Sequence, residues 1–155
     1  PHTLLTGLPP EENIKRLQWL MGRFTGYTGI TNHMGAKFVA AQQSFLPVLE
    51  ELHRRGLIYL DDGTAGRSTA GTIARDLGLG FATAQLSIDA EPSPERIDAA
   101  LDRLAGIARE QGFAIGIGTA LPATIDHVAE WATQLKSKGV MLVPVSAVVR
   151  SQHQS

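Results

Sequence analysis

Cysteine is absent from this 155-residue sequence. Disulfide bonds, thiolate metal sites and cysteine nucleophiles are therefore all excluded. The absence selects no compartment, because cytosolic and periplasmic proteins can equally lack cysteine. An excess of charge is missing as well, since 14 Lys and Arg residues face 15 Asp and Glu residues. Nucleic-acid phosphates favour clustered Lys and Arg, so a nucleic-acid partner is not expected.

Long apolar runs are also missing. None reaches the roughly 18 residues that a membrane-spanning helix needs, so no transmembrane segment is expected. Residues 1–6 lack the basic and apolar regions of a signal peptide, and the chain does not begin with Met, as expected of a piece of a longer protein. The length and the 43% hydrophobic content suit one domain over residues 1–150, with a frayed tail at 151–155.

Apolar runs and amphipathic stretches alternate along the chain. The expected helices cover roughly residues 10–24, 42–55, 69–77, 94–111 and 122–138, and the expected strands cover 27–31, 57–60, 81–84, 113–118 and 140–145. Continuous apolar strands are typical of a parallel sheet covered on both faces. Repeated strand–helix units also require parallel pairing with right-handed crossovers. The pattern therefore predicts an α/β fold, either an open doubly wound sheet or a closed barrel.

Ligands of parallel α/β folds bind where strands end, so the loops after the strands are the candidate sites. Asn32 and His33 follow the first expected strand, Asp61 and Asp62 the second, and Thr119 the fourth. A neutral histidine there can bind a metal or move a proton, and a loop histidine bonded to backbone is the ordinary alternative. Two adjacent acids can hold a cation or position a base, but Asp is also a usual turn residue.

Two familiar signatures are approached but not completed. Residues 61–64 resemble the Asp-x-Asp-Gly-Thr motif of aspartate-nucleophile phosphatases, but Leu60 stands where the first acid belongs. Gly116 and Gly118 begin a dinucleotide-binding fingerprint, but Leu121 occupies the third glycine position. Neither a Gly-x-Ser-x-Gly elbow nor a His-x-x-x-His pair occurs in the sequence.

Several short stretches become informative when their order and spacing are taken together. The first stretch is residues 31–38 (TNHMGAKF). The second group comprises residues 55–57 (RGL), Leu60, Asp61, Thr64 and Ser68. The third comprises residues 114–118 (AIGIG) with Leu121, Pro122, Thr124 and Ile125. As an ordered set they resemble the divergent polysaccharide deacetylase family of bacteria, from about Leu4 to Val145. The resemblance implies a distorted β/α barrel of parallel strands alternating with helices, of which this chain corresponds to the C-terminal three-fifths or so.

The resemblance also implies a chemistry. In the related polysaccharide deacetylases an Asp-His-His set binds a divalent metal, commonly zinc, which lowers the pKa of its bound water and polarises the acetyl carbonyl. By this resemblance His33 is expected to be a metal ligand and Asp61 a catalytic residue. The expected substrate-binding residues are Asn32, Thr64, Ser68 and Thr119.

The chain departs from the family pattern at two of these loops. The family often has Asp-Ser-Arg-Thr where this chain has residues 61–64 (DDGT), so an arginine is missing. It often has a histidine after the paired glycines, where this chain has Thr119. The paired aspartates of the family's first strand would lie upstream of Pro1.

The leading hypothesis, which follows from the resemblance, is a metal-dependent hydrolase that removes acetyl groups from glycans. The resemblance also suggests a periplasmic location, which the residues of this chain do not indicate by themselves. The alternative is a non-catalytic glycan-binding or scaffold domain that kept the barrel and lost the metal. A more distant hypothesis is an unrelated barrel enzyme that uses Asp61 with a small phosphorylated ligand. If the resemblance holds, His33, Asp61 and Thr119 are expected to gather at one end of the sheet.

Overall fold

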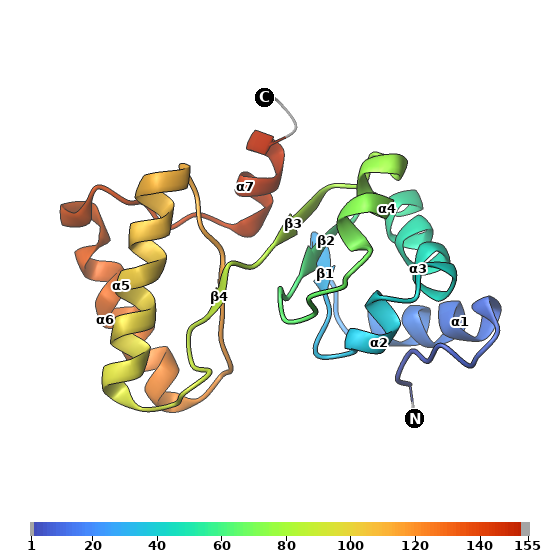
Figure 1. Cartoon of the computed structure of the whole chain (residues 1–155), viewed down its shortest axis with the longest axis horizontal. Helices are drawn as coiled ribbons and strands as arrows, with labels where there is room; N and C mark the ends of the chain where they lie inside the picture. The colour runs from blue at the N-terminus through green and yellow to red at the C-terminus, as the bar shows by residue number, and fades with distance from the viewer. Residues whose placement is uncertain (1, 153–155) are drawn as a thin grey trace. The chain divides into compact units, whose positions relative to one another are not determined.

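A computed structural model describes residues 2–152, with side chains up to residue 149. The chain forms two compact units (Figure 1): one contains the residues up to Ala82 together with those from Val149 onward, and the other is Thr83–Val148. Both are mixtures of helices and short strands, as the predicted α/β class requires. Across the described residues, no helix has the length and apolar character needed to cross a membrane. The single domain over residues 1–150 stays a prediction.

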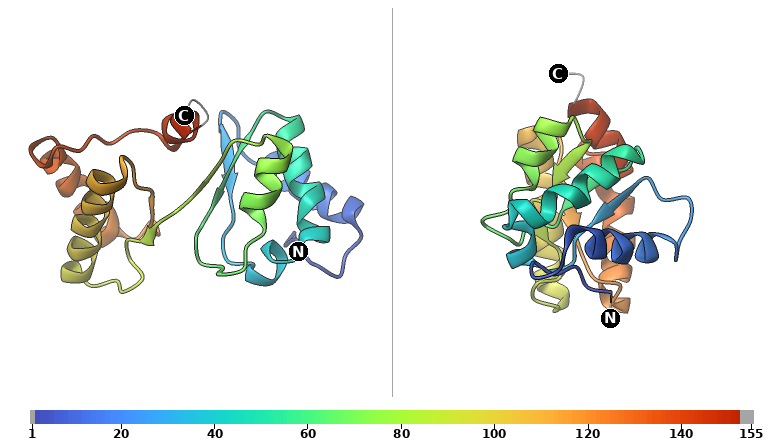
Figure 2. Two further views of the ribbon diagram at one scale, coloured as in Figure 1. Left: turned by 45° about the horizontal axis from the view of Figure 1, so that its top comes forward. Right: turned by 90° about the vertical axis from the view of Figure 1, so that its right-hand side faces the viewer.

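The first unit is a small sheet with helices stacked on one side. Its elements are α1 (Pro10–Met21), β1 (Gly29–Thr31), α2 (Ala36–Val39), α3 (Gln42–Arg54), β2 (Ile58–Asp61), α4 (Ala70–Leu77) and β3 (Phe81–Thr83). The strand order is β1-β2-β3, and β1 runs parallel to β2 with Gly29 opposite Ile58. Figures 1 and 2 show α3 and α4 on the same side of this sheet, with α1 beyond α3.

Close pairing of β1 and β2 depends on a glycine. A Cβ atom added at Gly29 would lie 2.7 Å from the backbone oxygen of Ile58 and 2.3 Å from its Cγ1. Any side chain at this position would therefore push the two strands apart. On the helical side, Phe45, Leu49 and Leu52 of α3 are buried, as their spacing predicts. These contacts hold the ends of β1 and β2 in a fixed register.

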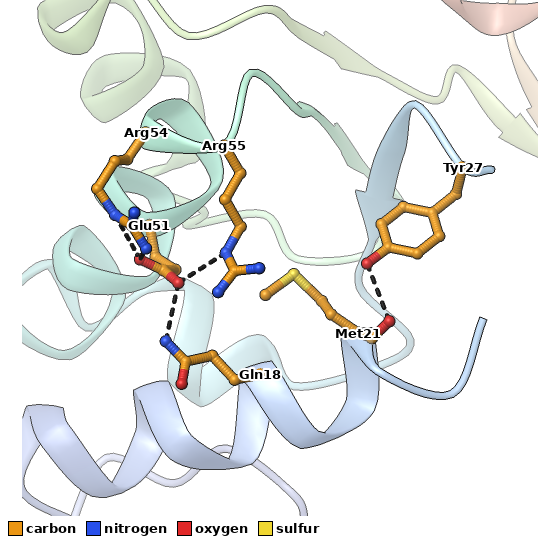
Figure 3. A network of polar contacts seen from close by, with 6 residues as sticks. All are labelled: Gln18, Met21, Tyr27, Glu51, Arg54 and Arg55. Atoms are coloured by element: carbon orange, nitrogen blue, oxygen red, sulfur yellow. Dashed lines mark hydrogen bonds and ion pairs between the residues drawn. The ribbon is translucent and has the colours of Figure 1, made fainter. Parts of the chain in front are cut away.

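A buried glutamate joins α1 to α3 (Figure 3). The Glu51 carboxylate accepts hydrogen bonds from Gln18 of α1 at 3.0 Å, from Arg54 at 2.6 Å and from Arg55 at 2.7 Å. Burial by itself raises the pKa of Glu51, but these hydrogen bonds and the Arg55 charge outweigh burial and lower the pKa to about 2. The carboxylate is therefore ionised over the whole ordinary pH range.

The second unit pairs two strands and packs two helices. Its elements are β4 (Leu86–Ser87), α5 (Pro94–Gln111), β5 (Gly116–Ile117), α6 (Pro122–Gln134) and the 3₁₀ helix η1 (Leu135–Lys138), and α7 (Val145–Gln152) begins in it. β4 and β5 are parallel, with Leu86 opposite Gly116. α6 packs along α5, and α5 packs on β4. Ile97 and Leu101 of α5 are fully buried, as their spacing predicts.

The strand predictions need two corrections. Among the described residues the strands form two small open sheets, of three and two strands, instead of one five-stranded sheet. Residues 140–145 form no strand: the Val140 N–H is already bonded to the Leu135 carbonyl at 3.1 Å, and Pro144 has no N–H to give to a ladder. Val145 instead begins α7, whose extent to Gln152 places residues 151 and 152 of the predicted tail in a helix. Residues 153–155 lie outside the described part.

Candidate functional site

Asn32 connects the loop after β1 to the loop after β2. Its side-chain oxygen Oδ1 accepts hydrogen bonds from the Tyr59 hydroxyl at 2.8 Å and from the Asp62 backbone N–H at 2.9 Å. Its Nδ2 donates to the Met34 carbonyl at 3.1 Å. Since β1 and β2 are parallel neighbours, their carboxyl ends lie at one edge of the sheet, and Asn32 fastens the two loops together there.

His33, the expected metal ligand, lies between Asn32 and Met34 and is exposed to solvent. Met34 has a φ of 60°, the one positive φ at a non-glycine position among residues 2–152. A left-handed backbone costs a non-glycine residue about 1–2 kcal/mol, so the surrounding contacts must impose it. The histidine is thus presented to solvent on a tight, strained turn.

Asp61, the expected catalytic residue, ends β2 and is 2% exposed. Its Oδ1 accepts the Gly63 backbone N–H at 2.9 Å, and its Oδ2 accepts the Ser68 hydroxyl at 2.5 Å. Ser68 Oγ in turn accepts the Ala70 N–H at 3.3 Å, at the start of α4. The structure therefore joins Ser68, an expected substrate-binding residue, directly to the expected catalytic carboxylate.

Asp62, the next residue along the chain, is also buried. Its Oδ1 accepts the backbone N–H of Thr64 at 2.9 Å and the Thr64 hydroxyl at 2.7 Å. Burial by itself raises the pKa of Asp62, but the Thr64 hydrogen bonds, with the nearby Asn32 amide and Met34 N–H, lower it overall. The pKa of Tyr59 is raised by burial and then by the charges of the two aspartates, so its hydroxyl remains a proton donor.

A second polar cluster lies in the other unit, around Asp89, which is not among the residues predicted from the sequence. Asp89 follows β4, and its Oδ2 accepts three hydrogen bonds: the Thr119 N–H at 2.7 Å, the Thr119 hydroxyl at 2.5 Å and the Thr124 hydroxyl at 2.9 Å. Burial opposes ionisation, yet these bonds lower the pKa of Asp89. One signal could have revealed it, since Asp89 directly follows the extended stretch 81–88 just as Asp61 directly follows the apolar run 57–60.

The structure brings Asn32, His33, Asp61, Thr64 and Ser68 together in one unit and places Thr119 in the other. The gathering of His33, Asp61 and Thr119 at one end of the sheet stays a prediction. Within residues 2–152, no three His, Asp or Glu side chains lie close enough together to hold a metal ion. A catalytic zinc site typically has three protein ligands, so the residues present do not by themselves fit one.

Comparison with known proteins identifies the relatives of this chain. A crystal structure of an uncharacterized protein from Agrobacterium tumefaciens C58 has a TM-score of 0.94 and 37% identity, over 96% of this chain and 60% of that one. The uncharacterized protein YibQ of Escherichia coli K12 is 31% identical over 63% of this chain and 30% of its own length. An uncharacterized protein of Haemophilus influenzae is 35% identical over 63% of this chain and 35% of its own length.

The chain thus matches about a third of the length of its curated relatives and three-fifths of the solved relative. The family described as divergent polysaccharide deacetylase matches over residues 1–149, which confirms the resemblance found in the loops after β1, β2 and β5. The chain belongs to the divergent polysaccharide deacetylase family.

Proposed function

We propose that the full-length protein is a periplasmic hydrolase that removes acetyl groups from glycans, and that this chain supplies part of its β/α barrel. Three observations support the proposal: the family match, the parallel strands followed by helices, and the polar residues that follow β1, β2 and β5.

The observation that carries the proposal is the junction of two polar loops at the carboxyl ends of β1 and β2. Chemistry in parallel α/β proteins concentrates at such strand ends. The junction offers an exposed imidazole, His33, beside loops that contain the buried carboxylates Asp61 and Asp62. An imidazole can bind a divalent metal or move a proton, and hydroxyl groups such as those of Thr64 and Ser68 suit carbohydrate hydroxyls.

The proposed divalent metal, with zinc as the first candidate, needs ligands beyond those of this chain. His33 can donate one nitrogen, but no three suitable side chains gather among residues 2–152. We therefore place the remaining ligands outside the described residues and assign no catalytic step through the metal. Asp61 is the carboxylate proposed to assist proton transfer, held in place by Gly63 and Ser68.

A second candidate function is favoured by the way the polar groups are used. The carboxylates of Asp61, Asp62 and Asp89 all accept hydrogen bonds from neighbouring residues of the chain. Thr119, which stands where the family often has a histidine, is bonded to Asp89 through both its backbone and its hydroxyl. This arrangement suits a domain that binds acetylated glycans without hydrolysing them.

One experiment separates the two functions. The full-length protein is assayed for bound metal and for acetate release from N- and O-acetylated glycans, with and without added Zn²⁺, and in parallel for glycan retention. Stoichiometric metal with metal-dependent acetate release supports the hydrolase. Glycan binding without metal or acetate release supports the binding domain.

The Thr119→His variant, which places a histidine next to the Asp89 carboxylate, is expected to bind metal more tightly than the parent.

A further inference from the structure

Two hydrogen bonds lead from the core of the first unit to the loop that carries His33. The Tyr59 hydroxyl donates to Asn32 Oδ1 at 2.8 Å, and Asn32 Nδ2 donates to the Met34 carbonyl at 3.1 Å. We propose that Tyr59 and Asn32 are positioning residues, which fix the direction in which His33 is presented by holding the backbone on either side of it. Asn32, which the family resemblance implies to be a substrate-binding residue, thus acts on the loop that carries His33.

The two hydrogen bonds from Tyr59 through Asn32 to Met34 are called the relay below. Tyr59 is held firmly at the start of this relay. Its side chain is 3% exposed, and its ring lies edge-on to Phe45 at 5.5 Å and stacks on Phe81 at 6.3 Å between ring centroids. The aromatic neighbours leave the ring little freedom, so the position of the hydroxyl is set by the core. The Asp62 N–H also donates to Asn32 Oδ1, at 2.9 Å, which fixes the amide from a second side.

The backbone of Met34 needs support from contacts other than its own side chain. Its φ of 60° is unfavourable for a residue with a Cβ, and Gly35 follows with a φ of 81°. The Met34 side chain is 70% exposed, so burial of that side chain cannot stabilise the turn. The bond from Asn32 to the Met34 carbonyl opposes the strain, together with the Met34 N–H beside the Asp62 carboxylate.

A fixed histidine is useful to the proposed hydrolase, and the inference rests on that proposed function. A catalytic or ligating group on a mobile loop must be ordered when the ligand binds, which costs affinity or rate. His33 is itself exposed, so its order must come from backbone contacts of the loop, to which the bonds through Asn32 contribute. Activity thus depends on Tyr59, a core residue, as well as on the residues of the loops.

The sequence offers a matched control, because it has two tyrosines and each donates one hydrogen bond. Tyr27 donates to the Met21 carbonyl at 3.0 Å, at the end of α1 (Figure 3). Tyr59→Phe and Tyr27→Phe remove the same hydroxyl, but only the first cuts the relay. The readout is the backbone order parameter of residues 32–35 by ¹⁵N relaxation in the full-length protein, which a general loss of stability does not change selectively.

In the parent we expect order parameters near those of rigid backbone, about 0.85, at residues 33–35. In Tyr59→Phe they should fall toward about 0.6, the flexible range, while Tyr27→Phe keeps the parent values. Equal values in all three proteins, or equal loosening in both variants, would overturn the inference. If Tyr59→Phe does not fold, Asn32→Ala decides in the same way, because it removes the relay at a partly exposed position.

Acetate release provides the functional readout. Tyr59→Phe is expected to lower kcat about tenfold with little change in KM. Loss of a residue that orients a metal ligand typically costs about 10- to 100-fold in activity, and we expect the lower end of that range. Tyr27→Phe is expected to change neither kcat nor KM. A loosened loop with unchanged kcat would contradict a positioning role. If the parent itself releases no acetate, the proposed hydrolase fails, whereas the order parameters still decide whether Tyr59 and Asn32 hold the His33 loop.

Discussion

Asp89 and Thr119, 30 residues apart, are joined twice: Asp89 Oδ2 accepts both the backbone N–H and the hydroxyl of Thr119. The same oxygen accepts the Thr124 hydroxyl from the first turn of α6. One buried carboxylate at the end of β4 therefore holds the loop that follows β5 and the helix that follows this loop. It organises the second unit much as Asn32 organises the loops of the first.

Asp89→Ala should consequently destabilise the second unit. The change leaves the Thr119 N–H and two hydroxyls without their acceptor, at a cost of about 2–3 kcal/mol in the free energy of unfolding. Urea denaturation of the parent and the variant measures this difference. Asp126→Ala is the control, since Asp126 is an exposed aspartate of the same unit, and it should cost less than about 0.5 kcal/mol. Equal costs for the two variants would show that Asp89 has no special structural role.

Glu51 should make stability depend on pH in the acid range. Its pKa is lowered from 4.5 to about 2, so its contribution is fully present above about pH 4.5 and is lost as the pH falls through about 2. Because Arg54 is 66% exposed and solvent screens the pair, we expect a contribution of about 1–2 kcal/mol. Denaturation of the parent, Glu51→Ala and the exposed neighbour variant Glu50→Ala between pH 2 and 7 measures it. Only in Glu51→Ala should the free energy of unfolding fall less steeply as the pH is lowered from about 4.5 to 2.

The ion pair of His127 with Asp98 should make stability depend on pH in the opposite direction. The bond of its Nδ1 to Asp98 Oδ1 at 2.6 Å raises the pKa of His127, and the charges of Asp98, Glu130 and Asp126 add to this effect. The stabilisation is thus fully present below about pH 6.5 and is lost as the pH rises through the raised value. NMR titration should show a lower His127 pKa in Asp98→Asn.

Asp102→Asn is the matched control for that titration, because Asp102 also lies on α5 but pairs with Lys138. The His127 pKa should be the same in this control as in the parent. If Asp98→Asn also leaves the His127 pKa unchanged, then the ion pair between α5 and α6 does not form in solution.

Local sequence signals predicted the helices better than the strands. Pro94 at the start of α5 and Gly112 at its end mark the helix boundaries that the structure has, because proline suits the first helical turn and glycine adopts the left-handed conformation that ends a helix. Strand length was overestimated at residues 113–118, where only Gly116 and Ile117 pair. Apolar runs show which residues avoid water, but ladder pairing depends on a neighbour elsewhere in the chain.

The candidate site was predicted in part for the same reason. Asn32 and Asp61 stand out because they end apolar runs, but their partners, Tyr59 and Ser68, are fixed only by tertiary contacts. Ile125, which fits the inward face of α6 by spacing, is 55% exposed. Thr124 is turned inward instead by its bond to Asp89, and neighbouring helical positions differ by about 100°. The rest of the apolar stripe holds, since Leu135 is buried and Val128 and Ala132 are partly buried, so the departure is confined to the first turn of α6.

The role of His33 is tested most directly by acetate release from acetylated glycans, measured together with bound metal in the full-length protein. His33→Ala is compared with His53→Ala, which removes an exposed histidine of α3. Because an open catalytic zinc site typically has only three protein ligands, loss of His33 should nearly abolish metal binding and acetate release. Folding should be retained, and His53→Ala should match the parent. Metal content and acetate release that are the same in His33→Ala as in the parent would contradict the proposed site.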